Sequence, residues 1–178
     1  SEKRLKPYTM NLKPTIRRAE PQDEDQIWNI LKQVIANGDT YVFSPDSSKA
    51  KMLAYWLAPE VHPYVAIHDE KIVGTFIIRD NFPDLGAHIA NASYMTLPQA
   101  RGQGIGSAMG IFSLMEAKRL GYRAMQFNIV VATNKGAIQL WQKLGFEIKG
   151  EIPGAFRHAK YGFVNTYIMW RSLENKLT

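Results

Sequence analysis

The sequence predicts an α/β fold with a mixed sheet, and two observations lead to that prediction. First, an apolar segment over residues 89–97 leads through a glycine-rich turn into an amphipathic helix that ends near Leu120. Second, another apolar segment over 124–131 is followed by a shorter helix-like segment over 134–144. A strand, a helix and a second strand in succession place the two strands parallel in one sheet. Strands joined by tight turns pair antiparallel, so the sheet as a whole is mixed.

The first half of the chain is predicted to contain one strand, two helices and two further strands. Pro21 suits the first turn of a helix, and the residues that follow have the spacing of an apolar helix face. Asp69-Glu70 forms a tight turn between two strand-like segments. The expected elements are a strand at 15–18, helices at 21–35 and about 48–57, strands at 64–68 and 71–79, and loops at 37–48 and 81–86.

The second half is predicted to alternate strands and helices before two closing strands. Asn134 is a good N-cap for the shorter helix, and Gly145 suits the left-handed position just after its end. The expected elements are a strand at 89–96, a helix to about 120, a strand at 124–131, a helix at 134–144, and closing strands at 146–149 and 165–171.

The composition is that of one globular domain. At 178 residues, the chain can bury one substantial core, and we expect a flexible lead-in over 1–13, a domain over 14–172 and a tail over 173–178. No apolar run spans a membrane and no N-terminal segment reads as a signal peptide, so a cytoplasmic protein is expected. The chain has no cysteine and four scattered histidines, which argues against a metal site. The net charge of +6 is spread out, which argues against nucleic acid as a partner.

The glycine-rich turn Arg101-Gly102-Gln103-Gly104-Ile105-Gly106 is the most informative motif. A turn of this kind between a strand and a helix presents backbone N–H groups and the positive end of the helix, which together suit a phosphate or pyrophosphate. The spacing Gly-x-Gly-x-Gly differs from the dinucleotide fingerprint, and Gly106-Ser107-Ala108 lacks the lysine of a P-loop. The turn therefore belongs to another class of phosphate site.

That class is identified by resemblance to a known family. The pattern Gln/Arg-x-x-Gly-x-Gly/Ala, carried here by Arg101, Gly104 and Gly106, resembles the coenzyme A loop of the GCN5-related N-acetyltransferases. The segment 134–146, which begins Asn-Lys-Gly-Ala and ends Gly-Phe, is similar to the family's second hallmark. The resemblance implies the single-domain acyl-CoA N-acyltransferase fold, with a mixed, mostly antiparallel seven-stranded sheet and about four helices. It also implies acetyl-CoA as the cofactor and coenzyme A as the product.

The same resemblance implies which residues bind the cofactor. Backbone groups of the strand before the turn would bond the pantetheine arm, the turn would hold the pyrophosphate, and the second helix would approach the thioester. The implied cofactor-binding residues are Tyr94, Met95, Thr96, Leu97, Arg101, Gly102, Gln103, Gly104, Ile105, Gly106, Ser107, Asn134, Gly136 and Ala137. Many relatives place a tyrosine four positions after the alanine as the acid for the thiolate. This chain has Trp141 there, and an indole is no general acid at neutral pH.

Residues 74–153 most resemble the fungal N-acetyltransferases that act on proline analogues such as azetidine-2-carboxylate. The matching pieces include Val73-Gly74-Thr75-Phe76, His88-Ile89-Ala90-Asn91-Ala92 and Phe127-Asn128-Ile129-Val130. The fungal group similarly has a tryptophan at the position of Trp141. The resemblance implies that Asn91 and Asn128 hold the carboxylate or amine of the acceptor, and that Asn134 steadies the thioester or thiolate.

The predicted catalytic residues are thus Asn134 and Asn128, and the predicted substrate-binding residues are Tyr41, Phe82, Asn91, Tyr94 and Asn128. Strict alternation places Asn91 and Tyr94 on opposite faces of their strand, and a bulge between them would bring both to the cleft. His88, Glu151, His158 and Tyr161 are candidates to act as base or to line the acceptor pocket, and none is assigned.

The predicted function is direct transfer of an acetyl group from acetyl-CoA to the amine of a small amino or imino acid. Three alternatives stay open: a primary amino-acid or phosphinothricin-type N-acetyltransferase, a protein N-terminal acetyltransferase, and a sensor that binds acyl-CoA without turnover. The expected partner is a small-molecule amine, with no membrane. A homodimer is plausible because relatives often pair through their C-terminal strands.

Overall fold

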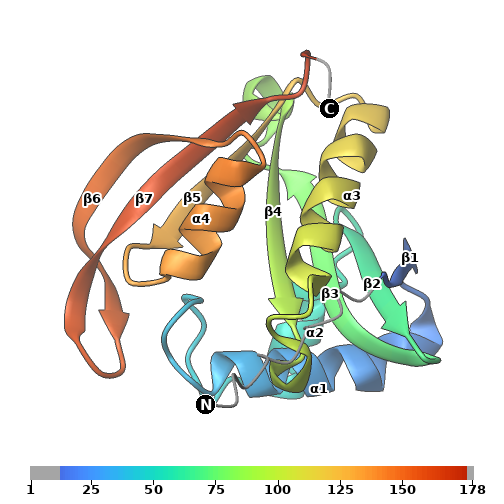
Figure 1. The fold of residues 1–178 in the computed structure, drawn as a ribbon. Coiled ribbons are helices and arrows are strands. Elements are labelled where there is room, and N and C mark those ends of the chain that lie inside the picture. Colours follow the sequence, from blue (N-terminus) through green and yellow to red (C-terminus); the bar gives the residue numbers. More distant parts are fainter. Residues whose placement is uncertain (1–12, 176–178) are drawn as a thin grey trace, which may run out of the picture.

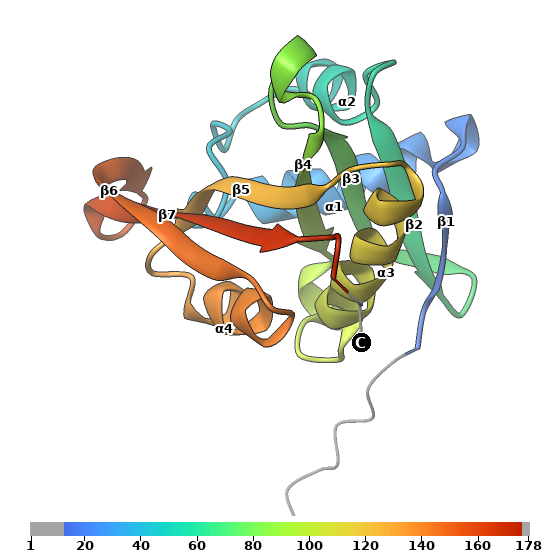
Figure 2. The same ribbon diagram turned by 90° about the horizontal axis from the view of Figure 1, so that it is seen from above.

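A computed structural model describes residues 13–175, which fold as a seven-stranded sheet with two helices on each face (Figures 1 and 2). The strands are β1 (Thr15–Arg18), β2 (His62–His68), β3 (Lys71–Asp80), β4 (Ile89–Thr96), β5 (Ala124–Val131), β6 (Glu147–His158) and β7 (Gly162–Ser172). The helices are α1 (Glu24–Ile35), α2 (Lys49–Trp56), α3 (Ile105–Arg119) and α4 (Lys135–Lys143). Residues 1–12 of the predicted lead-in and 176–178 of the predicted tail lie outside the described residues.

The sheet is mixed and mostly antiparallel, as predicted. Its strand order is β1-β2-β3-β4-β5-β7-β6, and only the β4–β5 pair is parallel. In Figure 2, α1 and α2 lie on one face of the sheet, and α3 and α4 lie on the other. Within the described part of the chain, no helix has the length and apolar character needed to cross a membrane.

Buried side chains of β3 pack against a helix layer on each face of the sheet. On the α2 side, the Trp56 indole donates to Thr75 Oγ1 at 2.9 Å, and the Thr75 hydroxyl donates to the Tyr64 carbonyl at 2.8 Å. On the α3 side, the Phe76 ring stacks between the rings of Tyr64 and Tyr94, with centroids 4.8 Å and 5.6 Å away. Phe76 and Thr75 are fully buried neighbours in β3, so this strand joins the two halves of the core.

The last two strands are longer than predicted. β6 extends from 147 to 158, where the sequence indicated a strand only over 146–149, and β7 begins at 162 rather than 165. Glu151 and His158 therefore lie in a strand and not in a loop. The reason is that β6 is an edge strand whose residues are nearly all exposed, so it lacks the apolar alternation by which strands are recognised.

The central strands separate where the cofactor was predicted to lie. β4 and β5 pair only at Ile89↔Ala124 and Ala90↔Met125, and beyond that point they diverge, as Figure 1 shows. The predicted bulge in β4 is wrong, because its register against β3 is unbroken from Gly74↔Thr96 to Asp80↔Ala90. The bulge lies instead in β5, between Phe127 and Val130, so that two residues of β5 oppose one of β7.

Gly74 allows α3 to lie directly against β3, and its replacement tests that packing. A Cβ added at Gly74 would lie 2.8 Å from Met109 Sδ and 2.9 Å from Ile105 Cγ2, both in the buried core. We expect Gly74→Ala to lower the free energy of unfolding by about 1–3 kcal/mol, measured by urea denaturation. Gly150→Ala is the matched control, since its nearest neighbour would be Ile168 Cδ1 at 3.6 Å. An equal loss in both variants would contradict the packing argument.

Candidate active site

The glycine turn after β4 presents a row of free hydrogen-bond donors. Gly102 and Gly104 have φ angles of +75° and +86°, which glycine adopts without strain, and Gly104 is the N-cap of α3. Among residues 13–175, no acceptor receives a hydrogen bond from the backbone N–H groups of 102–107. Free N–H groups at the positive end of a helix suit an anion. The turn therefore fits the pyrophosphate of acetyl-CoA.

A cavity of about 770 Å³ extends from this turn along the gap between β4 and β5. Its walls come from β4, the glycine turn, α3, β5, α4 and the loop between α1 and α2. The predicted site residues that line it are Tyr41, Asn91, Tyr94, Met95, Thr96, Arg101, Gly102, Gly104, Ile105, Gly106, Ser107, Asn128, Asn134, Gly136 and Ala137. The cavity is large enough for the arm of a cofactor together with a small acceptor.

Three predicted site residues do not line this cavity. Leu97 is buried in the core, where its N–H donates to the Val73 carbonyl at 2.8 Å. The Gln103 side chain donates to the Gln99 carbonyl at 3.4 Å, which leaves only its backbone facing the turn. Phe82 is 58% exposed, on a loop held by a short turn at Asp84–Gly86. The direction of each side chain depends on its place in the strand, turn or loop. The residue types alone do not predict it.

Tyr41 holds the free edge of β4. Its hydroxyl accepts a hydrogen bond from the Tyr94 N–H at 3.2 Å and donates one to the Tyr94 carbonyl. Both groups lie where β4 has already parted from β5. Burial raises the pKa of Tyr41 to about 12, so the phenol is protonated at neutral pH and remains a donor. The Tyr41 hydroxyl thus satisfies the two backbone groups of Tyr94 that β5 leaves unpaired after the strands diverge.

Tyr41→Phe is expected to tighten acetyl-CoA binding about two- to tenfold, because it removes one competitor for the backbone groups of Tyr94. Isothermal titration of acetyl-CoA into the wild type and the variant measures this directly. Tyr55→Phe is a suitable control, because Tyr55 also lines the cavity. Its ring packs against Phe43 and under the Arg79 guanidinium, away from the Tyr94 backbone bonds that Tyr41 makes. Weaker binding by Tyr41→Phe would mean that the phenol contacts the cofactor instead.

Asn91 and Asn128 belong to one network of amides at the β4–β5 divergence. Asn91 Nδ2 donates to the Gln126 carbonyl at 3.1 Å. Asn128 Oδ1 accepts from Gln126 Nε2 at 3.0 Å, and Asn128 Nδ2 donates to Asn81 Oδ1 at 2.8 Å. The bulge places Asn128 at a point where β5 bends. The network holds both amides at the cavity wall in fixed orientations.

Asn134 has the predicted capping role and also lines the cavity. Its Oδ1 accepts from the Ala137 N–H at 3.3 Å, which satisfies one free donor of α4. Its Nδ2 makes no hydrogen bond with residues 13–175 and is available to a ligand. Capping therefore fixes the side chain and leaves its donor free.

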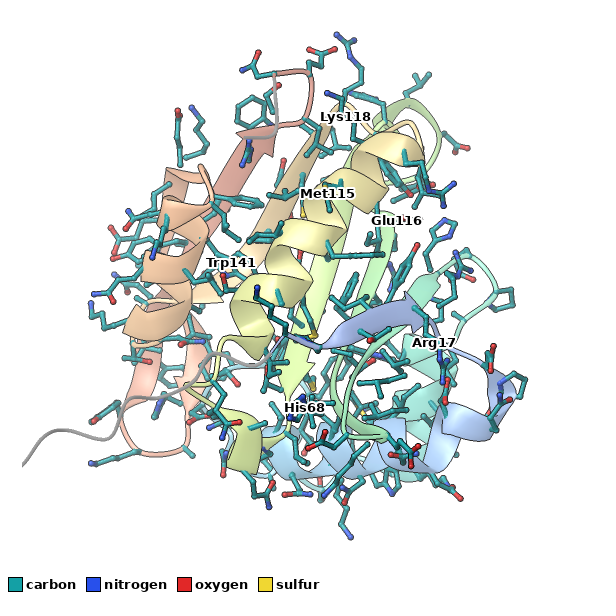
Figure 3. All side chains as sticks on the ribbon, turned by 45° about the vertical axis from the view of Figure 1, so that its right-hand side comes forward. Arg17, His68, Met115, Glu116, Lys118 and Trp141 are labelled. Carbon is teal, nitrogen blue, oxygen red and sulfur yellow. The ribbon has the colours of Figure 1, made fainter. Side chains whose placement is uncertain are left out.

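Trp141 fills the position where many relatives have an acidic phenol. Its ring packs against Tyr94, Phe127 and Phe146, with centroids 4.7, 4.8 and 5.8 Å away. It lies on the side of α4 that faces α3, as Figure 3 shows. Tyr94 does not replace the missing acid. Its hydroxyl bonds Ser113 Oγ at 2.6 Å inside the core, and burial raises its pKa.

The other candidate groups differ in their placement. His88 and Glu151 line neither this cavity nor a smaller one beside it, and Glu151 accepts a hydrogen bond from Asn165 Nδ2 at 3.1 Å. His158 and Tyr161 line the smaller cavity. Asp39 and Thr40 line both cavities and were not predicted, although they stand directly before Tyr41 in the sequence.

The diverging parallel strands, the glycine turn and the cavity between them define an acyl-CoA-binding class of protein. A family model described as the acetyltransferase (GNAT) family matches residues 28–146, which is more than half of the chain. The chain belongs to this family. The structure is also similar to that of a GCN5-related N-acetyltransferase from Kribbella flavida, with a TM-score of 0.85 and 36% identity, covering 89% of this chain and 97% of that one.

Two further proteins are similar to the chain. It is 36% identical over 110 residues to N-acetyltransferase aca1 of Schizosaccharomyces pombe, covering 60% of this chain and 53% of that protein. The chain thus spans about half the length of that curated relative. A GNAT superfamily phosphinothricin acetyltransferase from Sinorhizobium meliloti, solved in complex with acetyl-CoA, has a TM-score of 0.81 over 94% of both chains. At 24% identity, that likeness shows the shared fold alone.

Proposed function

We propose that this chain is an acetyl-CoA-dependent N-acetyltransferase that acts on the amine of a small amino or imino acid, with proline analogues as the nearest class. The observation that carries the proposal is one continuous cavity that runs from the free N–H groups of the glycine turn to the amides of Asn91 and Asn128. Its relatives are named N-acetyltransferases, and one is solved with acetyl-CoA.

Each part of the cavity has a task in that reaction. Bound acetyl-CoA supplies an activated thioester. The N–H groups of 102–107 hold its pyrophosphate, and the Tyr94 backbone at the edge of β4 aligns its arm once Tyr41 turns aside. Asn134 Nδ2 is a free donor for the charge that develops as the thioester is attacked.

The acceptor lies at the other end of the cavity in this proposal. Asn91 and Asn128 are fixed by their network and contact the acceptor, whose amine attacks the thioester carbonyl in a ternary complex after its ammonium form has lost a proton to solvent. The new C–N bond forms as the C–S bond breaks, the nitrogen loses its second proton, and coenzyme A leaves as a thiolate that takes up a proton from solvent. Trp141 and its aromatic neighbours close the wall beside the leaving group and exclude water.

Release of free thiol from acetyl-CoA tests the proposal. The panel contains azetidine-2-carboxylate, 4-hydroxyproline, primary amino acids, phosphinothricin, polyamines and short peptides. We expect saturable release with the cyclic imino acids. Preferred turnover of phosphinothricin or of peptides would move the chain to one of the other acetyltransferase classes. Tight acetyl-CoA binding without release for any amine would contradict enzymatic function and indicate a sensor.

A further inference from the structure

A second, smaller cavity of about 330 Å³ lies next to the main one, and Asn134 is one of the residues that line both. Asp39 and Thr40 also line both cavities. Its outer wall is the turn between β6 and β7, which meets the α1–α2 loop: the Ala159 N–H donates to the Gly38 carbonyl at 3.0 Å. Two segments far apart in the sequence thus close one polar chamber next to the predicted acetyl transfer site.

Asp39 and Thr40 line this cavity, and each has a buried oxygen without a partner. Asp39 Oδ1 and Thr40 Oγ1 make no hydrogen bond within the described part of the chain. Unpaired buried oxygens are costly, and that of a carboxylate is the costlier of the two. A ligand with a cationic N–H group satisfies the carboxylate, and the position of Asp39 between the two cavities places that group next to the thioester end.

The outer wall carries donors. His158 Nδ1 accepts from the N–H groups of Lys160 and Tyr161 at 3.0 and 3.2 Å, so the neutral ring carries its proton on Nε2. The Lys160 ammonium lies 5.2 Å from the centroid of the Tyr161 ring and forms no ion pair with a carboxylate among residues 13–175. An unpaired ammonium beside a ring N–H suits a carboxylate ligand.

We propose that the smaller cavity holds the carboxylate of an α-amino or α-imino acid on Lys160 and His158 Nε2–H, with its ammonium on Asp39, which lines both cavities. Asn91 and Asn128 of the main cavity then contact the amine and not the carboxylate. The inference rests on the proposed function and narrows its acceptors to amines with an adjacent free carboxylate. Polyamines offer no carboxylate to Lys160, and in a peptide the residue bearing the amine has its carboxyl group in an amide bond. Lys160 is then the residue that decides which amines are acetylated.

Two probes that differ only in the carboxylate test this assignment: azetidine-2-carboxylate and azetidine, at saturating acetyl-CoA. For Lys160→Met we expect the KM for the acid to rise at least about tenfold more than the KM for azetidine. Lys160→Arg restores most of the loss. Asp39→Asn raises the KM of both probes, because both carry the ammonium. Lys149→Met is the control, since this lysine lies in the same hairpin, at the start of β6, but pairs with Glu147 and lines neither cavity.

The outcomes separate this inference from the proposed function. If the acid is acetylated but Lys160→Met behaves like Lys149→Met, the inference is overturned and the proposed function stands. If no amine is acetylated, the proposed function fails, and titration of azetidine-2-carboxylate into the protein loaded with coenzyme A still decides the inference. Binding that Lys160→Met weakens at least about tenfold supports it, and absence of binding to the wild type overturns it.

Discussion

Replacing Gly104 by alanine is expected to raise the Kd for acetyl-CoA by about a hundredfold or more, because two or more charge-assisted hydrogen bonds of the turn are lost together. Gly104 has a φ angle of +86° at the N-cap of α3. An alanine held there costs about 1–2 kcal/mol, and relief of that strain turns the neighbouring N–H groups away from the cavity. Isothermal titration with acetyl-CoA measures the loss.

Gly121→Ala is the matched control for this prediction. Gly121 has a φ angle of +95°, lies in the turn after α3, and has no atom within 4 Å of an added Cβ. An alanine at this position therefore has a similar backbone strain to one at 104, but the position does not line the cavity. Both variants should unfold at similarly lower temperatures, while only Gly104→Ala loses acetyl-CoA. Equal losses of binding would show that strain anywhere around α3 disturbs the site, and that the turn itself is not the anion site.

The parts of the site with local signals were predictable from the sequence. The glycines of the turn, the Asn134 cap and Gly145 occupy the predicted positions, because a positive φ or a capped helix end restricts residue type locally. The β4 boundaries match the prediction for a similar reason, since Pro98 ends the strand.

The remaining parts of the site depend on contacts between segments that are far apart in the sequence. The bulge at Asn128 arises where β5 meets β7, and neither strand carries a local sign of that register. Asp39 and Thr40 reach the cavities because their loop is held by Ala159 of the β6–β7 turn. Tyr41 was predicted as a substrate-binding residue, but its bond to the edge of β4 requires knowing where β4 and β5 separate.

Asn128→Ala is expected to lower kcat/KM for the acceptor about 10²–10³-fold, in the range found when one oriented donor is removed from an active site. The Kd for acetyl-CoA should change less than about threefold, because Asn128 lies at the acceptor end and contributes nothing to the N–H row of the glycine turn. Initial rates with the best acceptor, together with titration of acetyl-CoA, separate the two effects.

Asn81→Ala distinguishes a catalytic amide from a structural one. Asn81 accepts from Asn128 Nδ2 and does not line the cavity, so its loss removes one of the two hydrogen bonds that orient the Asn128 amide and leaves the bond from Gln126 Nε2. If Asn128 contacts the acceptor, Asn81→Ala lowers kcat/KM only about tenfold or less, far less than Asn128→Ala, since an amide that is held less firmly still reaches its target part of the time. If the two variants lose activity and stability in equal measure, the amide network only holds β5 against the 81–86 loop. The acceptor would then be held by other groups, such as Asp39, which lines both cavities.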